Sequence, residues 1–196
     1  MRTRRRGFTL VEVVLVCALV VLLAMIAYPT LQSLYDDLRL NSATDQVRAA
    51  WTQARVQAID EGRAYRFSVV PGKGNYRLAP DAGEYWAGNG GPGGAENTDP
   101  NAEPPLVLED ALPRGVRFAL ADGNTPLDFN ANEETAAPIG SVDVGQYVTL
   151  ATFLPDGTAR EDVSIAFSTK GSRPLLLRLR GITGASSVQY LSENGR

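Results

Sequence analysis

The 196-residue sequence contains no histidine and only one cysteine, Cys17. Without histidine, the chain cannot form His-ligated metal sites or the Ser-His and Cys-His pairs with which many hydrolases activate a nucleophile. A single cysteine cannot form a disulfide within the chain, and we interpret Cys17 as a small packing residue in an apolar segment. These absences exclude most familiar hydrolases and a fold held together by disulfides.

Charge is unevenly distributed along the chain. The formal net charge is −3, from 19 basic and 22 acidic residues, but four of the basic residues lie at the very start, as Arg2, Arg4, Arg5 and Arg6. The sequence from residue 8 onward therefore has 15 basic against 22 acidic residues, a net charge near −7. The 168 residues after residue 28 are enough for one domain of ordinary size with its own core.

One long apolar segment, residues 8–28, follows the arginines. As a helix rising about 1.5 Å per residue it would extend roughly 30 Å, which matches the hydrocarbon core of a bilayer. Because no comparable basic cluster follows it, the positive-inside rule places the amino terminus in the cytoplasm and the remainder across the membrane. A cleavable secretory signal fits less well, since its apolar region is shorter and Met25 stands where a small residue is needed.

Glu12 is a carboxylate early in this apolar segment. Burying an ionised carboxylate in hydrocarbon costs at least about 2.5–3.5 kcal/mol on insertion scales, so Glu12 indicates a partner or a function. A plain membrane anchor is the simpler interpretation, but it does not account for the residues around this acid, which read Gly7-Phe8-Thr9-Leu10-Val11-Glu12.

This string resembles the start of type IV pilin precursors, in which a short basic leader ends in glycine before a Phe-Thr-Leu-(Val/Ile)-Glu sequence. The resemblance implies that residues 1–7 are a leader, that a prepilin peptidase cuts between Gly7 and Phe8, and that the new Phe8 amine is methylated. In a staggered bundle, Glu12 of one subunit would then meet the Phe8 amine of its neighbour and set the register of assembly. Removing one partner of such a buried pair typically costs about 3–5 kcal/mol.

A helix is predicted over residues 8–61, bent near Pro29, because proline withdraws one amide and crowds the preceding turn. In its second part, residues 29–62, apolar residues recur at three- and four-residue steps, which predicts an amphipathic continuation. Gly62 marks its end, since glycine readily adopts the left-handed conformation that closes a helix. The apolar positions are Leu31, Leu34, Leu38, Leu40, Ala43, Val47, Ala50, Trp51, Ala54 and Ala58.

From residue 63 onward the apolar period changes to two, which predicts strands separated by turns. We expect an α+β fold in which one long helix packs on antiparallel sheets formed by residues 63–196. A stretch at about 80–105 is rich in glycine, proline and acids, and we expect it to be a flexible acidic loop. The expected strands are 64–70, 76–79, 106–108, 116–121, 147–154, 163–168, 175–180 and 188–191.

Two further segments resemble the GspH/FimT branch of minor pilins. One closes the helix as Ala54-Arg55-Val56-Gln57-Ala58-Ile59-Asp60-Glu61-Gly62, and the other reads Phe153-Leu154-Pro155-Asp156-Gly157-Thr158. The resemblance implies a minor pseudopilin of a type II secretion system: a structural protein without enzyme activity or cofactor. It would be anchored in the bacterial inner membrane, with its carboxyl-terminal domain in the periplasm. Its partners would be prepilin peptidase and the other pseudopilins or pilins of the filament.

The same branch also suggests an alternative, a FimT-like minor pilin that binds DNA in natural transformation. DNA binding needs a locally basic surface, and the cluster available is Lys170, Arg173, Arg178 and Arg180. Against this alternative, the Gly-Arg-x-Arg motif of that group is represented only by Gly195-Arg196, and the acidic central region would repel DNA. A solvated edge strand whose charges resist aggregation also explains the cluster.

A run of oxygen-bearing side chains offers ligands of the kind that calcium binds, but their spacing lacks the central glycine and terminal glutamate of an EF-hand. The run comprises Asp122, Asn124, Asp128, Asn130, Asn132, Glu133 and Glu134. The glycine-rich segments lack the Lys-Ser/Thr pair of a phosphate-binding loop. Glu109 and Asp110 are adjacent and would point apart on a strand, so they form no catalytic pair. We therefore predict no metal site and no catalytic residues.

Overall fold

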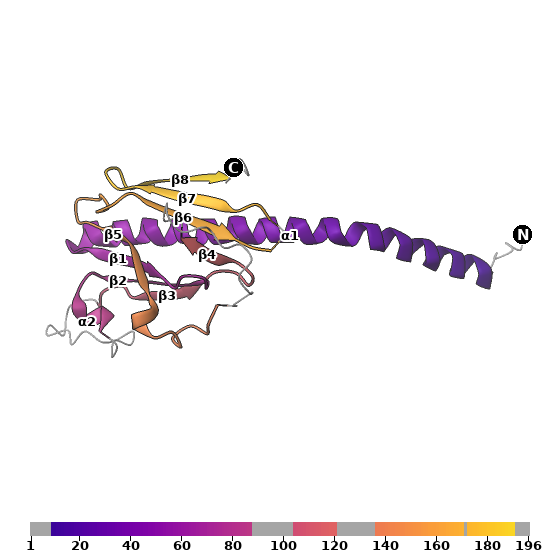
Figure 1. Cartoon of the computed structure of the whole chain (residues 1–196), viewed down its shortest axis with the longest axis horizontal. Coiled ribbons are helices and arrows are strands. Elements are labelled where there is room, and N and C mark those ends of the chain that lie inside the picture. The colour runs from indigo at the N-terminus through magenta and orange to yellow at the C-terminus, as the bar shows by residue number, and fades with distance from the viewer. Residues whose placement is uncertain (1–8, 88–103, 121–135, 171, 191–196) are drawn as a thin grey trace, which may run out of the picture.

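The structure is a computed structural model that describes residues 9–87, 104–120, 136–170 and 172–190. One long helix, α1, projects far beyond a domain of two antiparallel sheets (Figure 1). The predicted α+β class, a long helix packed on antiparallel sheets, is confirmed. Most of the acidic loop expected at about 80–105, residues 88–103, lies outside the described residues, whereas residues 83–86 of that stretch form a short helix and not a loop. The oxygen-rich run 122–134 also lies outside the described residues.

Helix α1 (Leu10–Glu61) has 52 residues and closes at Gly62, whose φ of 66° is left-handed. Its end therefore agrees with the prediction. The helix continues through Pro29 without a break, and its free half curves away from the axis of the half beside the domain (Figure 1). At about 1.5 Å per residue, α1 is roughly 78 Å long.

The second half of α1 buries one stripe of side chains against the sheets. The buried positions are those predicted from Leu40 to Ala58, namely Leu40, Ala43, Val47, Ala50, Trp51, Ala54 and Ala58. Leu34 and Leu38 were expected on the same stripe, and that expectation is wrong, because both side chains are more than half exposed. Both residues precede the point where the helix meets the sheets. Their side chains therefore have the correct spacing but no sheet surface to pack against.

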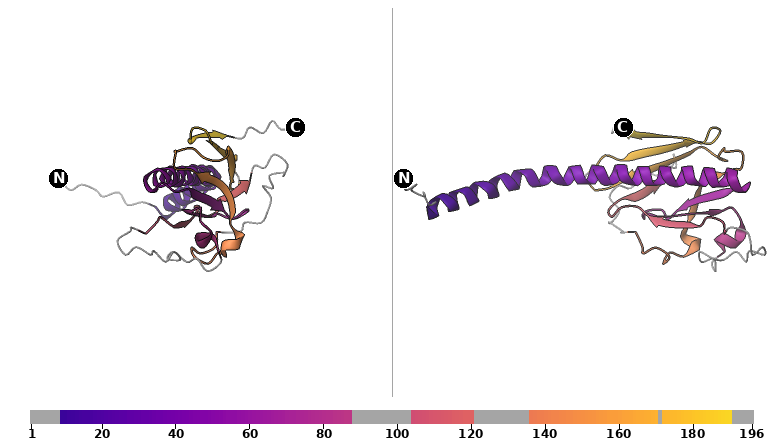
Figure 2. Two further views of the ribbon diagram at one scale, coloured as in Figure 1. Left: turned by 90° about the vertical axis from the view of Figure 1, so that its left-hand side faces the viewer. Right: turned by 180° about the vertical axis from the view of Figure 1, so that it is seen from behind.

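The first sheet contains β3 (Leu108–Ala111), β2 (Asn75–Pro80), β1 (Tyr65–Val69) and β5 (Val148–Phe153), in that order. The second contains β4 (Arg117–Leu120), β6 (Val163–Ser168), β7 (Leu175–Arg180) and β8 (Ala185–Tyr190), also in that order. Every neighbouring pair is antiparallel. Seen end-on and from behind, α1 runs alongside both sheets (Figure 2).

Most strands lie where the alternation placed them, and β6 and β7 have the predicted bounds. Two strands are displaced. β3 begins at Leu108, later than expected, because its register is set by pairing with β2. β8 begins at Ala185 rather than Val188, because Ala185, Ser186 and Ser187 pair with β7 despite their small polar side chains.

A chain of aromatic rings joins the helix to both sheets. Trp51 of α1 meets Phe67 of β1 edge-on with ring centroids 5.9 Å apart, and Phe67 lies 5.5 Å from Tyr76 of β2. Tyr76 then meets Phe118 of β4 at 6.4 Å, and Phe118 lies 5.6 Å from Phe167 of β6. Offset and edge-on pairs of this kind contribute about 0.5–1.5 kcal/mol each beyond their burial. The two sheets and α1 therefore share one core.

The face of the first sheet that points away from α1 is also covered, by a polar layer. Arg77 on β2 is almost completely buried, forms an ion pair with Glu109 on β3 and donates to the carbonyl of Tyr85 at 2.9 Å. Tyr85 belongs to the short helix α2 (Gly83–Trp86), and the Arg77 guanidinium lies 5.6 Å from the Trp86 ring centroid. A charged residue is thus part of this domain's interior.

Main-chain hydrogen bonds tie the two sheets together at their ends. The Phe118 amide donates to the Lys73 carbonyl at 3.0 Å, and Gly72 donates to the Phe118 carbonyl at 3.2 Å. At the other end, Ala159 donates to the Gly181 carbonyl at 2.7 Å and Arg160 donates to that of Thr152 at 2.9 Å. The bonds of Phe118 and Thr152 use backbone groups on the outer edges of β4 and β5.

Candidate assembly site and candidate nucleic-acid interface

The predicted cleavage point lies immediately before the start of α1. Gly7 and Phe8 are outside the described residues, whereas Thr9 occupies the cap position with extended backbone angles. Its hydroxyl oxygen accepts a hydrogen bond from the Glu12 amide at 3.3 Å, which satisfies one of the donors left open at a helix start.

Glu12 is in the first turn of α1, where its negative charge is favoured by the helix dipole. Its side chain is exposed, and it forms no ion pair with any residue that the structure describes. The sequence analysis missed the role of Thr9. The signal was present, since Thr9 and Glu12 have the Thr-x-x-Glu spacing of a helix capping box.

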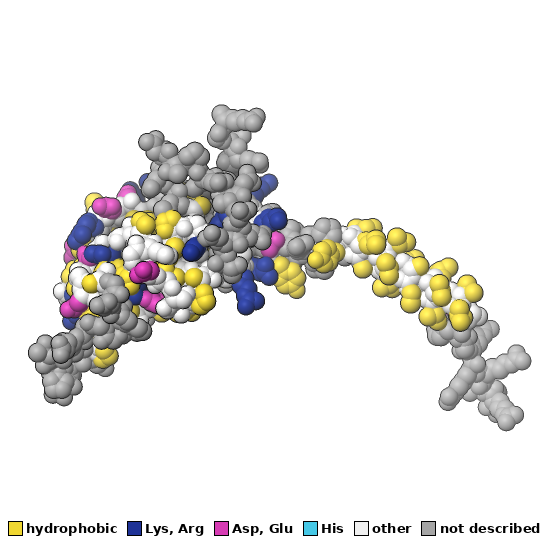
Figure 3. Space-filling model, turned by 60° about the horizontal axis from the view of Figure 1, so that its bottom comes forward, with side chains coloured by type: hydrophobic (Ala, Val, Ile, Leu, Met, Phe, Trp, Pro, Cys, Tyr) yellow, Lys and Arg dark blue, Asp and Glu magenta, His cyan; other side chains and the backbone are white. Residues whose placement is uncertain are grey.

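The first half of α1 exposes its apolar side chains, and the face of the projecting helix seen in Figure 3 is largely yellow. Every Leu, Val, Met and Ile from Leu10 to Ile26 is more than half exposed. Within the part of the chain that the structure describes, no helix is both long enough and apolar enough to cross a membrane.

Arg55 connects the two segments on which the GspH/FimT resemblance was based. Its guanidinium lies beside two glycine turns, one at Gly157 between β5 and β6 and one at Gly184 between β7 and β8. A methyl group on Gly184 would come within 3.0 Å of the Arg55 Cζ and 2.9 Å of the Gly157 carbonyl oxygen. Both glycines have positive φ, 81° and 62°, which side chains rarely adopt. The fold thus brings together two segments about a hundred residues apart in sequence.

The four predicted basic residues do not form one compact cluster. Arg178 and Arg180 are exposed on the same face of β7, as the alternation predicted, while Leu175, Leu177 and Leu179 face the core. Lys170 and Arg173 lie in the connection before β7, beyond the other end of a strand about 17 Å long. A basic surface here would be built on Arg178 and Arg180.

The titratable groups whose pKa is perturbed are not grouped as an acid-base pair. Burial and the hydrogen bond to Glu61 raise the pKa of Tyr65, and burial together with the charge of Asp110 raises the pKa of Tyr76. Burial also raises the pKa of Tyr147 to about 12. Among the described residues, no group of three or more Cys, Asp or Glu side chains is placed to hold a metal ion.

Comparison with known proteins identifies one motif. Residues 2–28 match the family model described as the prokaryotic N-terminal methylation motif. No curated protein sequence matches the chain.

Among solved structures, the minor pseudopilin EpsH from the type II secretion system of Vibrio cholerae is similar in two determinations. One has 14% identity and a TM-score of 0.45 and covers 82% of this chain and 99% of that chain. The other has 8% identity and a TM-score of 0.45 and covers 78% and 97%. The type IV minor pilin FimU of Pseudomonas aeruginosa has 14% identity and a TM-score of 0.41, and covers 78% of this chain and 88% of that chain.

The family match spans the basic leader, the Gly7 to Glu12 string and the apolar segment that follows. The chain therefore carries the prokaryotic N-terminal methylation motif, as the sequence predicted, ahead of a domain of two antiparallel sheets.

Proposed function

We propose that this protein is a structural minor pseudopilin of a type II secretion pseudopilus, with no enzymatic activity of its own. The observation that carries the proposal is the division of α1: one half is buried against the β domain, and the other half projects with its apolar side chains exposed. Residues 10–28 of the methylation motif belong to that projecting half.

The exposed apolar side chains in the first half of α1 need an apolar environment outside the chain's own β domain. Its side chains from Leu10 to Ile26 are largely uncovered, and burying them would contribute on the order of 10–20 kcal/mol. We infer that the inner membrane supplies this environment after synthesis, with the amino terminus in the cytoplasm and the β domain in the periplasm. The helices of neighbouring subunits would replace the lipid in the filament.

Processing would expose the site of assembly. Cleavage between Gly7 and Phe8 by prepilin peptidase, followed by methylation, leaves a cationic amine one helical turn from Glu12. The amine of one subunit and the Glu12 carboxylate of the next would then neutralise each other in the filament.

Replacement of Glu12 by alanine tests this proposal. We expect normal cleavage and membrane insertion, measured by the mass of the mature protein and by membrane fractionation, but loss of the protein from sheared pseudopilus filaments. Asp45→Ala is the matched control, because Asp45 is an exposed acid on the domain-bound half of α1. Filaments that incorporate the Glu12 variant as well as the control would refute the role of Glu12 in register.

DNA binding is the second candidate function, and the exposed pair Arg178 and Arg180 favours it. A gel-shift experiment with a fragment from residue 28 onward separates the two functions. Salt-sensitive DNA binding that is lost in Arg178→Gln/Arg180→Gln would favour DNA uptake over secretion, since phosphate contacts release counterions.

A further inference from the structure

Strand β8 is a sheet edge that no other segment of the described residues pairs with or covers. It ends the second sheet, and its sequence, Ala185–Tyr190, contains no charged residue and no proline. Soluble proteins usually protect such edges with charges, proline, bulges or covering segments, because unpaired main-chain groups attract another strand.

The other three edge strands are protected in one of these ways. β3 carries Glu109 and Asp110, β4 is bonded along its outer side to residues 72–73, and β5 is paired near its end with residues 159–160. Among the strands that the structure describes, β8 is thus the edge without protection.

The side chains of β8 extend an apolar surface toward this edge. Ser186, Val188 and Tyr190 stand opposite Leu179, Leu177 and Leu175 of β7, whose side chains face the core. Val188 is 38% exposed and Tyr190 is 65% exposed, so the apolar face continues past the cover that α1 provides. Another strand placed beside β8 would bury both side chains.

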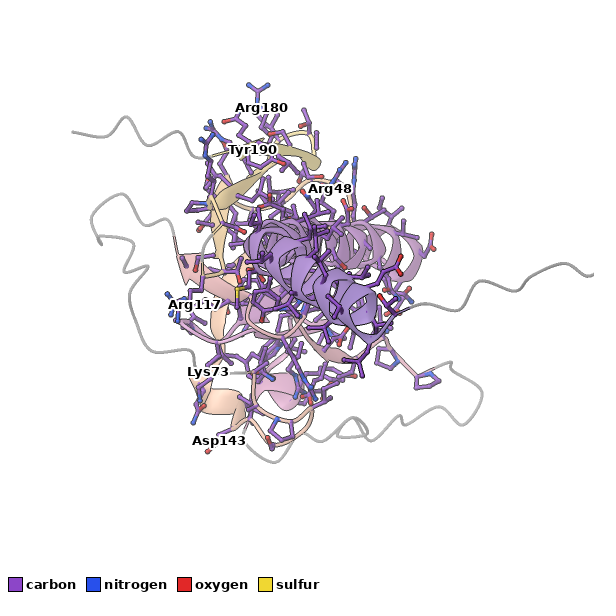
Figure 4. The ribbon with its side chains drawn as sticks, turned by 90° about the vertical axis from the view of Figure 1, so that its right-hand side faces the viewer. Arg48, Lys73, Arg117, Asp143, Arg180 and Tyr190 are labelled. Carbon is purple, nitrogen blue, oxygen red and sulfur yellow. The ribbon has the colours of Figure 1, made fainter. Side chains whose placement is uncertain are left out.

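Arginines flank the edge on both faces of the sheet. On the outer face, Arg178 stands opposite Ser187 and Arg180 opposite Ala185, whose small side chains leave room for the guanidinium groups to reach across β8. On the inner face, the Nε of Arg48 from α1 donates to the Ser186 hydroxyl at 3.3 Å. Figure 4 shows Arg180, Tyr190 and Arg48 on the same side of the molecule.

These three arginines have unused capacity for carboxylates. In the part of the chain that the structure describes, none of Arg48, Arg178 and Arg180 forms an ion pair. A guanidinium binds a carboxylate through paired hydrogen bonds, and opposite charges on neighbouring strands stabilise the pairing.

We propose that the free edge of β8 binds an extended, acidic segment of another polypeptide, which adds a strand to the second sheet. Main-chain hydrogen bonds supply the pairing, and carboxylates on the two faces of the incoming strand bind Arg178 and Arg180 on one side and Arg48 on the other. A second copy of β8 is a poorer occupant, because it brings the same arginines. DNA could offer phosphates to the arginines, but it has no peptide main chain that could form hydrogen bonds with the edge of β8. This inference goes beyond the proposed function and does not depend on it.

The test uses the full chain in detergent micelles and a fluorescein-labelled nine-residue peptide of valine, threonine and glutamate, with glutamates on both strand faces. We expect fluorescence anisotropy to report saturable binding, and hydrogen exchange to show new protection at residues 185–190. The same peptide with lysine in place of glutamate should bind at least tenfold more weakly.

Two double variants with the same change of net charge separate local recognition from overall charge. Arg178→Gln/Arg180→Gln should weaken binding by about three- to tenfold, because two cross-strand charge pairs are lost. Arg39→Gln/Arg63→Gln, on exposed arginines of α1 and the segment after it, should bind as the parent does. Ser187→Glu should also weaken binding, because it places a competing carboxylate opposite Arg178.

The proposal is overturned by equal binding of the acidic and basic peptides, or by binding without protection of residues 185–190. Concentration-dependent dimers that protect β8 would identify a second copy as the occupant instead. Protection of this surface by double-stranded DNA, with no binding of the acidic peptide, would assign it to nucleic acid.

Discussion

Gly181 follows β7 at the start of the turn that leads into β8, and we predict that alanine at this position strongly destabilises the domain. A methyl group there would stand 2.8 Å from the Ala159 carbonyl oxygen and 2.9 Å from that of Glu161. Gly181 cannot move away freely, since its amide donates to Asp162 Oδ1 at 2.7 Å and its carbonyl accepts from Ala159 at 2.7 Å. Overpacking costs about 1–3 kcal/mol and each of the two lost hydrogen bonds about 0.5–1.5 kcal/mol, so we expect a total of about 2–6 kcal/mol.

Urea unfolding of the full chain in detergent micelles, followed by circular dichroism, measures this loss. For a slope of about 2 kcal/mol per molar urea, the midpoint should fall by about 1–3 M. Gly145→Ala is the matched control, because a methyl group there meets no atom within 4 Å and Gly145 does not have a positive φ. If Gly181→Ala unfolds at the same urea concentration as Gly145→Ala, the close approach of the two carbonyl groups does not constrain this turn.

Two further predictions concern buried polar groups. Arg77→Met should cost about 3–5 kcal/mol of stability in the same urea assay, because it leaves the partly buried Glu109 carboxylate without its partner. The control Arg63→Met removes a more exposed ion pair, with Glu61, and should cost less than about 1 kcal/mol. Equal losses of stability in the two variants would contradict this prediction. Stability should also fall as the pH rises above about 10, because Tyr76 has a raised pKa in the folded protein and an ordinary one after unfolding. Each tyrosine of this kind contributes a slope of about 1.4 kcal/mol per pH unit. Urea midpoints at pH 9, 10 and 11 check this, and a Tyr76→Phe variant with an unchanged slope would count against it.

The sequence was most informative where local chemistry alone determines structure. The three- and four-residue spacing from Leu40 to Ala58 identified the buried face of α1, and Gly62 identified its end, because both depend on helix geometry. The spacing did not reveal where the packed region begins. Leu34 has the right position on the helix, but only the location of the sheets decides whether it is covered.

Long-range partners could not be predicted in this way. Arg77 lies in a strand whose sequence gives no sign of a buried charge, and its burial depends on Glu109, which is 32 residues away. β8 was predicted too short, because the pairing of Ala185 and Ser186 comes from β7 and not from their own strand propensity. For the candidate site, Arg178 and Arg180 were correctly placed on one face by alternation. Their separation from Lys170 required the connection between β6 and β7 to be known.

Because α1 is a single unbroken helix from the methylation motif to Gly62, it fixes the directions around its axis in which side chains at its two ends point relative to each other. The buried stripe holds the β domain on one side of the helix axis. The direction of the Glu12 side chain relative to the domain follows from the number of residues between Glu12 and this stripe. Inserting one residue in the free half would turn Glu12 by about 100° relative to the domain and displace it by about 1.5 Å. The length of α1 therefore determines which way the surface of the β domain, including the β8 edge, would face when Glu12 of one subunit meets its neighbour.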